Sequence, residues 1–433
     1  MSHLGFINSA LAALLLSTNL LAADEPRTTI VHAGTLLAVP GQDAKPEQSL
    51  IIVDDKILEV RDGYVAASDF EGSVDIVDLK DKFVLPGLMD MHVHFTLAPK
   101  RPDFLKTSDS DYALMAAGNA QTTLLAGVTT VRDIGATSAE AIIAVRDAVN
   151  DGTIPGPRII AAGESISATA GHGERRGQRD DIADLVQSKA MCDGADDCRR
   201  AVRSQYKLGA DMIKVHATGG GADPNGKRYS APEMFDDELE AVVETAHRLG
   251  LKVTAHAHGT AGIKAAIRAG VDSVEHSSWF DDDAIEMYLD TGTYVVKTAY
   301  LQDYFLSRPQ IPKRIQDMRR ANIAIAEPMV REAIKRGVKF AMGTDSGVMP
   351  HGQNAKEIWK YVELGMSPME AIETATVNAA DLMGKSDQLG TLEAGKFADV
   401  IAVDVSPLED ITSLESVSFV MRSGVVYKSS ETM

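Results

Sequence analysis

Cysteine is scarce in this chain, which has only two among its 433 residues, Cys192 and Cys198 in the segment MCDGADDCRR. The CxxxxxC spacing, with no histidine nearby, argues against a zinc site built from cysteine. Because the segment is polar, we expect both side chains to lie near the surface. A local disulfide between them stays an open alternative if the protein is exported, since disulfides persist in oxidising compartments.

Basic residues are also under-represented. The chain has 43 lysines and arginines against 62 aspartates and glutamates, a formal net charge of -19. This acidic balance argues against nucleic acid or an anionic membrane as a partner. With 45% hydrophobic and 24% charged residues, the composition is that of a globular protein long enough for one large domain and a smaller one.

Long apolar runs are confined to the N-terminus, where one spans about Ala10 to Leu21 and is followed by Ala22 and Ala23. This run is too short for a membrane span, and it fits the apolar core and cleavage site of a secretory signal, although no Lys or Arg precedes it. We therefore expect residues 1–23 to be a signal peptide and the protein to be periplasmic or secreted. A buried N-terminal helix is the alternative.

Short strand-like segments open and close the rest of the chain, at residues 24–86 and 385–433. They are β-rich and are punctuated by Asp, Gly and Pro. Neither end could bury a core alone. We therefore expect the two ends to pair into one small composite β-sandwich domain.

Between these ends, residues 87–384 alternate apolar strand-like runs with amphipathic helical stretches. Eight such runs can be counted, from FVLPGLMDMHVH to VKFAMGTDSG. This alternation predicts an α/β fold with a parallel sheet, and eight repeats favour a closed (β/α)8 TIM barrel. An open doubly wound sheet is the alternative, which is weakened because no GxGxxG follows the first strand.

Polar residues recur at the C-terminal ends of five predicted strands. In the stretch LPGLMDMHVHF, His92 and His94 are two residues apart, so both point to the same face of a strand. The active site of a TIM barrel lies at the C-terminal ends of its strands, and imidazole and carboxylate are ligands that suit zinc. The other residues of this set are Lys214 on the fourth strand, His256 and His258 on the fifth, His276 on the sixth and Asp345 on the eighth.

In running order, PGLMDMHVH, GTDSG and GTLEAGKFADVIAVD resemble the metal-dependent amidohydrolase superfamily. The segments ATAGHG, IKVHATGGG and PHGQNAKE resemble the branch that holds Xaa-Pro dipeptidases, N-acyl amino acid hydrolases and ochratoxin-hydrolysing amidohydrolases. The resemblance implies two divalent metal ions, usually zinc, that activate water to hydrolyse an amide bond. The implied ligands are His92, His94 and Asp345 for one metal, His256 and His276 for the other, and an N-carboxylated Lys214 that bridges the two.

The resemblance also implies further roles. Asp345 would move the proton, and the family pattern favours His256 over His258 as the ligand, so that His258 supports the ligands from behind. His216 faces the same way as Lys214 and is either a substrate contact or an ordinary rim histidine. We expect a small amide substrate whose released amine carries a carboxylate. Its expected contacts come from loops after the strands: His172, Arg228, Tyr229 and His351.

Two rival functions compete with this one. A mononuclear deaminase or imidazolonepropionase-like hydrolase would share the barrel and most ligands but would lack the lysine bridge, so Lys214 favours the binuclear enzyme. A non-catalytic oligomeric binding protein would have lost metal ligands, and every ligand is present here. The resembling branch includes homo-oligomers up to octamers, so we also expect this chain to assemble.

Overall fold

The computed structural model describes residues 27–97, 103, 106–174, 179, 182, 188–220 and 230–429. The predicted signal peptide lies outside these residues, as do Arg228 and Tyr229. Within the described part, no helix combines the length and the apolar character that a membrane span requires.

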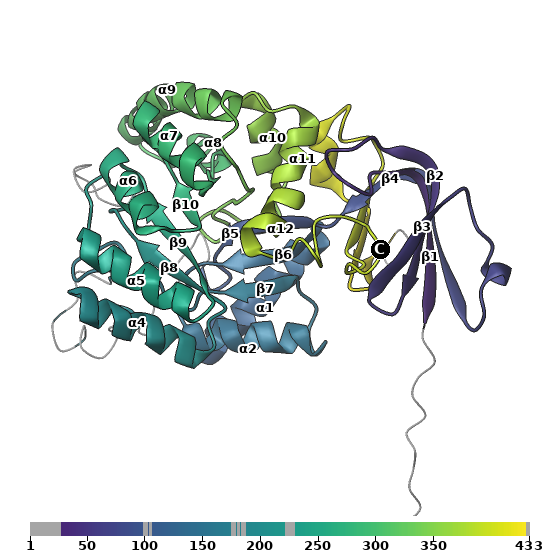
Figure 1. The fold of residues 1–433 in the computed structure, drawn as a ribbon, viewed down its shortest axis with the longest axis horizontal. Helices are drawn as coiled ribbons and strands as arrows, with labels where there is room; N and C mark the ends of the chain where they lie inside the picture. The colour runs from purple at the N-terminus through teal and green to yellow at the C-terminus, as the bar shows by residue number, and fades with distance from the viewer. Residues whose placement is uncertain are drawn as a thin grey trace, which may run out of the picture.

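The two ends of the chain contribute to one seven-stranded sheet, drawn in purple and yellow on the right of Figure 1. Its order is β14-β13-β12-β4-β1-β2-β3, with β1 and β4 parallel and the other neighbours antiparallel. The strands are β1 (Thr28–Leu36), β2 (Lys45–Val53), β3 (Lys56–Asp62), β4 (Val74–Pro86), β12 (Val400–Val403), β13 (Phe419–Arg422) and β14 (Val425–Lys428).

Parallel strands fill the middle of the chain, in two sheets. The first has the order β5-β6-β7 and the second β11-β10-β9-β8. Isolated parallel bridges link Ile166 to Val215, Val295 to Phe340 and Val93 to Ser346. The strands are β5 (Leu88–Val93), β6 (Val128–Asp133), β7 (Arg158–Ala161), β8 (Met212–His216), β9 (Lys252–Ala257), β10 (Ser273–His276) and β11 (Tyr294–Val296).

The eighth predicted strand, around residues 338–346, is present only as isolated bridges at Phe340 and Ser346. Two backbone features accompany this difference: the N–H of Met342 donates to the carbonyl oxygen of Thr374 rather than to a neighbouring strand, and Asp345, with a φ of 60°, ends the extended segment. The segment nevertheless lies beside both β5 and β11. It therefore brings the side chain of Asp345 next to the histidines of β5.

Helices alternate with the parallel strands and cover them on the outside (Figure 1). Ser108 and Ser138 cap α1 and α2 by accepting a hydrogen bond from the backbone N–H three residues later. The helices are α1 (Asp109–Leu125), α2 (Ala139–Asn150), α4 (Ala195–Leu208), α5 (Asp236–Arg248), α6 (Thr260–Ala269), α7 (Asp282–Thr291), α8 (Tyr300–Leu306), α9 (Lys313–Lys335), α10 (Lys356–Glu363), α11 (Pro368–Thr374) and α12 (Val377–Met383).

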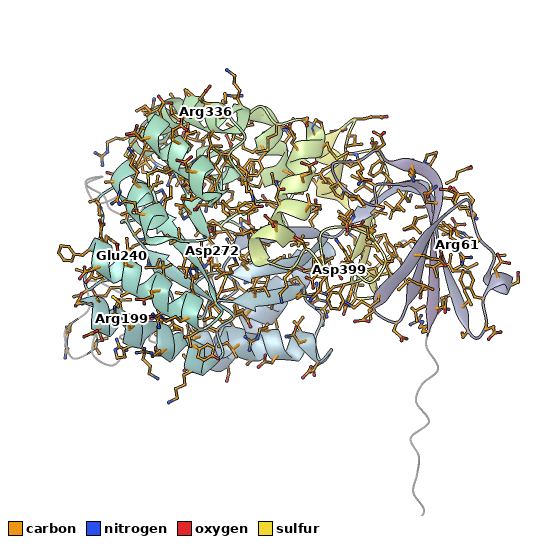
Figure 2. The ribbon with its side chains drawn as sticks, in the orientation of Figure 1. Arg61, Arg199, Glu240, Asp272, Arg336 and Asp399 are labelled. Carbon is orange, nitrogen blue, oxygen red and sulfur yellow. A yellow bond between two sulfur atoms is a disulfide. The ribbon has the colours of Figure 1, made fainter. Side chains whose placement is uncertain are left out.

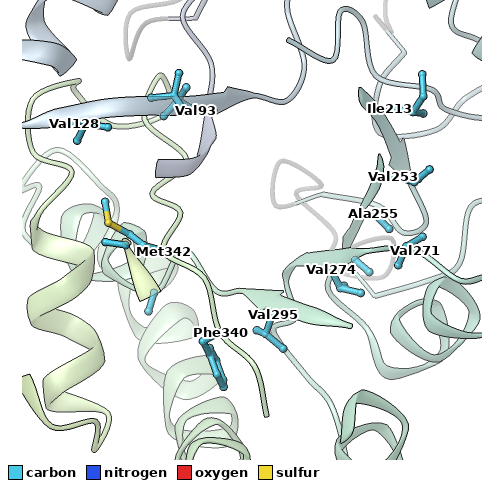
Figure 3. Close-up of a cluster of buried hydrophobic side chains, with 14 of the residues drawn as sticks. Val93, Val128, Ile213, Val253, Ala255, Val271, Val274, Val295, Phe340 and Met342 are labelled. Atoms are coloured by element: carbon cyan, nitrogen blue, oxygen red, sulfur yellow. The ribbon is translucent and has the colours of Figure 1, made fainter. Parts of the chain in front are cut away.

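Apolar side chains of the parallel strands form the main core, part of which Figure 3 shows. Val93, Val128, Ile213 and Val295 are fully buried members of this cluster. The seven-stranded sheet is attached to it by an ion pair between Arg158 at the start of β7 and Asp399 just before β12, 2.8 Å apart. Asp399 lies at the junction of the two regions in Figure 2.

The two cysteines form a disulfide, and the expectation that they lie near the surface is wrong. Cys192 is 1% exposed and Cys198 is fully buried. Cys198 is in the first turn of α4, on the same helix face as Ala201 and Val202, which are also buried. The polar residues of this segment occupy the opposite face, so average polarity was a poor guide to the burial of single positions.

Candidate metal centre

A cavity of about 710 Å³ opens at the C-terminal ends of the parallel strands. Titratable residues at the strand ends line one side of it. Helices α8 and α9 line the other, with apolar residues such as Leu301 and Phe305 and charged ones such as Asp303 and Glu327. The sequence-predicted residues that line it are His92, His94, Lys214, His256, His258, His276 and Asp345, together with His172 and His216.

The first group of potential metal ligands consists of His92, His94 and Asp345. Oδ1 of Asp345 lies 3.5 Å from Nε2 of His92 and 3.3 Å from Nε2 of His94. Nδ1 of His94 is 2.8 Å from the carbonyl oxygen of Gly135, which fixes the ring with Nε2 toward Asp345. Burial alone would raise the pKa of Asp345, but the neighbouring His92 and the hydrogen bond with His94 lower it. The three side chains are close enough to bind one metal ion.

A buried ion pair that the sequence analysis missed orients His92 from behind. Nδ1 of His92 lies 2.7 Å from Glu275 Oε2, and Oε1 of Glu275 lies 2.8 Å from a guanidinium nitrogen of Arg132. Thr254 also donates to Glu275. Burial opposes ionisation, yet the charge of Arg132 and the hydrogen bond from His92 hold the pKa of Glu275 at about 2. A carboxylate behind a ligand histidine fixes its tautomer and raises its basicity.

The second group of potential metal ligands consists of His256, His258 and His276. The rings of His258 and His276 are stacked with centroids 4.7 Å apart, and that of His256 is 4.6 Å from each of them. Nδ1 of His276 pairs with Thr298 Oγ1 at 2.8 Å, which leaves Nε2 for a metal. Burial, followed by the charges of neighbouring groups, lowers the pKa of all three well below the usual value, so they are neutral and able to coordinate.

His172 and His216 form a third group with His256. The ring of His172 stacks on that of His256 with centroids 4.5 Å apart and meets His216 edge-on at 4.8 Å. Nδ1 of His216 is buried without a hydrogen-bond partner in the described structure. His172, predicted on a loop, and His216, predicted on the strand of Lys214, therefore converge beside the second group.

Lys214 is the most unusual group in the centre. Its side chain is 2% exposed, and its Nζ has no hydrogen-bond partner among the described residues. Burial lowers the pKa of Lys214 to about 8. Its charge affects the pKa of His92 and Asp345 in the first group and of His276 in the second. An ammonium left alone in such a site is costly unless something else neutralises it.

Backbone strain is concentrated at the same place. His276 and Ser277 after β10, Thr298 after β11 and Asp345 all have positive φ values, of 69°, 41°, 50° and 60°. Such conformations cost about 1–3 kcal/mol each in a residue other than glycine. They persist where the surrounding structure enforces them, which is typical of functional sites.

Lys297, directly after β11, also lines the cavity and was missed from the sequence. Its Nζ donates to the carbonyl oxygens of His276 at 2.7 Å and Ser277 at 3.3 Å. Burial lowers the pKa of Lys297 to about 8, so most molecules carry the cation at neutral pH. The signal that could have revealed it was a lysine that ends the apolar run TYVVKT.

The predicted substrate contacts are only partly brought together. His172 lines the cavity, whereas His351 does not. The ring of His351 packs against Phe95 at 5.3 Å, and its Nδ1 faces Thr123 Oγ1 at 3.4 Å. The loop that carries His351 turns back toward α1, so its position in the sequence after the eighth strand did not place it over the metals.

Comparisons with known proteins agree with this geometry. The model of the amidohydrolase family matches residues 83–427. The chain is 33% identical over 443 residues to the ochratoxinase of Aspergillus niger, covering 94% of this chain and 88% of that protein.

A crystal structure of a Xaa-Pro dipeptidase with methionine in its active site superposes with a TM-score of 0.84 at 37% identity, covering 93% of this chain and 100% of that one. The crystal structure of A. niger ochratoxinase gives a TM-score of 0.82 at 32% identity, covering 94% of this chain and 96% of that one. The expected hydrolase is thereby confirmed at the level of the family, and this chain belongs to the amidohydrolase family.

Proposed function

We propose that this chain is a binuclear metal-dependent amidohydrolase that cleaves an amide or peptide bond and releases an amine bearing a carboxylate. The observation that carries this proposal is Lys214, whose buried Nζ has no hydrogen-bond partner among the described residues and whose charge acts on members of both groups. A mononuclear deaminase or imidazolonepropionase-like enzyme would have no use for such a lysine.

The residues present fit two divalent metals. His92, His94 and Asp345 would hold one, and His256 and His276 the other, while imidazole and carboxylate together suit zinc. We keep His256 as the ligand because it belongs to two of the three groups of potential ligands in the centre.

N-carboxylation would explain why Nζ of Lys214 has no hydrogen-bond partner among the described residues. The ammonium first loses one proton to give the neutral amine. The amine then adds carbon dioxide, a nitrogen–carbon bond forms and a second proton leaves, so that an anion with two oxygen atoms replaces the cation. The lowered pKa of Lys214 supports this step, because only the neutral amine reacts. Carbamate oxygens would then match the positive charge of the metals.

The metals, when bound, would acidify a water molecule and polarise the scissile carbonyl. The carboxylate of Asp345 lies between His92 and His94, where it would accept the proton of the attacking water and pass it to the leaving amine. Glu275 would keep Nε2 of His92 directed at the centre. Both cysteines are tied in a disulfide and are therefore excluded as nucleophiles.

The substrates to be tested follow from the relatives, which include an ochratoxinase and a Xaa-Pro dipeptidase. Metal-loaded protein should hydrolyse members of a panel of N-acyl amino acids, Xaa-Pro dipeptides and ochratoxin A. Metal analysis should find two ions per chain in the wild type and at most one in Lys214→Met. Two ions in the variant, or deamination of a ring substrate without amide cleavage, would refute the proposal. An absence of bound metal would favour a non-catalytic binding protein.

We also propose that the two parallel sheets form one closed (β/α)8 barrel. Three bridges support this: Ile166–Val215 joins the segment after β7 to β8, while Val295–Phe340 and Val93–Ser346 join the eighth segment to β11 and to β5. The seven-stranded sheet would curl into a sandwich around its own apolar cluster, which includes Val31, Leu50 and others.

Export of the protein is a further proposal, supported by the disulfide between Cys192 and Cys198. Cell fractionation and N-terminal sequencing of the mature protein would test it. Assembly into a homo-oligomer, up to an octamer, is proposed by analogy with the resembling branch. Light scattering of the purified protein would measure the state directly.

A further inference from the structure

Three described lysines line the cavity, and one of them forms ion pairs with carboxylates. Lys360, also on the cavity wall, has Nζ 3.0 Å from Asp303, 3.5 Å from Glu327 and 3.0 Å from Glu363. Neither Lys214 nor Lys297 forms an ion pair with any described residue. A desolvated cation normally has an anionic partner, and only Lys214 is accounted for by the proposed metal centre.

The contacts of Lys297 leave room for a ligand. Nζ donates two hydrogen bonds, to the carbonyl oxygens of His276 and Ser277. An ammonium carries three N–H donors, so one donor is not used by these bonds. Both carbonyls belong to residues with positive φ, whose strained backbone is held in place by the surrounding fold. Lys297 is thus a fixed cation on the wall of the cavity.

The acidic residues near Lys297 interact with it electrostatically but form their hydrogen bonds or ion pairs with other groups. Glu357 is the first, and its two carboxylate oxygens accept from the backbone N–H groups of Ala299 and Tyr300. Burial raises the pKa of Glu357, and the two backbone N–H groups and the charge of Lys297 oppose this rise. Glu327 is the second, and it lies 3.5 Å from Lys360.

We propose that Lys297 binds the carboxylate of the substrate, on the amine that hydrolysis releases. This proposal rests on the proposed amide hydrolysis and names the residue that selects its substrates. The α-carboxylate of an amino acid is one carbon away from the scissile nitrogen, so its receptor must lie beside the metal ligands. Nζ of Lys297 lies 2.7 Å from the backbone carbonyl oxygen of His276, and the side chain of His276 is one of the proposed ligands.

The alternative is that Lys297 only supports the turn at His276 and Ser277. This structural role would affect every substrate alike, whereas a carboxylate receptor affects only acids. The experiment therefore compares an N-acyl amino acid with the same compound ending in a neutral amide. In Lys297→Met, kcat/KM for the acid should fall about 10- to 100-fold relative to the amide, as expected for a lost charged hydrogen bond.

Lys360→Met is the matched control, because it removes a cation from the same cavity that is already paired with carboxylates. It should change the ratio of acid to amide turnover much less than Lys297→Met does. Equal losses on both substrates in Lys297→Met would overturn the carboxylate-binding role and leave the structural one.

A binding measurement keeps the test decisive if no amide in the panel is hydrolysed. Calorimetry with 3-phenylpropanoate and with 3-phenylpropanamide needs no turnover. Lys297→Met should weaken binding of the acid about 10-fold or more and leave the amide unchanged. Unchanged binding of the acid would refute the role of Lys297. Failure of hydrolysis with intact acid binding in the wild type would instead count against the proposed function alone.

Discussion

At the scale of single residues, this centre depends on which nitrogen of each histidine is free. Nδ1 of His92 pairs with Glu275, and Nδ1 of His94 with the carbonyl oxygen of Gly135. Nδ1 of His276 pairs with Thr298. In each case, Nε2 is left for coordination, so the residues behind the ligands decide their orientation.

Asp345→Asn tests the proton-transfer role at this scale. The amide can fill the same space but cannot accept a proton from water. We expect kcat of the metal-saturated variant to fall about 10²- to 10⁴-fold, the usual contribution of a general acid–base group. Steady-state kinetics with metal analysis in parallel would measure this. Turnover near the wild-type level would show that another group carries the proton.

His256 and His258 can be told apart by comparing matched variants. His256→Asn should retain only one metal ion per chain, because it removes a ligand that belongs to two groups. His258→Asn should still bind two ions, although its ring stacks on His276. Metal analysis after dialysis against zinc would measure both. The opposite result would make His258 the ligand.

At the scale of elements, the eighth segment is held where it is by a close approach to its neighbours. A Cβ atom on Gly343 would lie 2.3 Å from Val296 Cγ1 and 2.8 Å from His92 Cβ. Neither neighbour can move easily, because Val296 is fully buried and the ring of His92 is held by the buried Glu275. The absence of a side chain at Gly343 thus places Asp345 against β5.

Gly343→Ala should therefore displace the eighth segment. We expect the free energy of unfolding to fall by about 1–3 kcal/mol, as is usual for overpacking, and metal affinity to fall with it. Denaturant titration and metal competition would measure the two effects. Gly118→Ala on the exposed face of α1 is the control, since a Cβ there meets nothing within 4 Å. The free energy of unfolding of that variant should rise by up to about 1 kcal/mol. Equal changes in the two variants would contradict the role given to Gly343.

At the scale of the whole molecule, strands far apart in sequence meet at one cavity, and repulsion between their polar ends must be balanced. Removal of metal by a chelator should lower the melting temperature, because bound ligand stabilises the folded state by about 2.7 kcal/mol per site at a 100-fold excess over Kd. Calorimetry before and after chelation would measure the change, and zinc should restore it. An unchanged melting temperature would argue against a tightly held metal in the folded protein.

Much of this architecture could be predicted because its signals are local. Apolar runs that end in histidine or aspartate identified the strands around the site, and the pairing of His92 with His94 follows from the period of a strand. Glu275 and Arg132 were missed because their roles depend on a contact across 143 residues. Their only signal was the presence of charged residues within buried strands. The wall formed by α8 and α9 was also missed, since nothing local says which helix faces the cavity.

The sequence by itself determined the family, the alternation of strands and helices and the residues that could bind metal, because these depend on spacing along one chain. Tertiary structure alone decided which candidates meet. It brought His172 and His216 to His256, and it turned His351 away toward Phe95. It also placed Lys214 and Lys297 beside these histidines, where neither forms an ion pair with a described residue. The physical reason is that burial and charge balance depend on what surrounds a side chain in space, and neighbours in space are set by packing rather than by position in the chain.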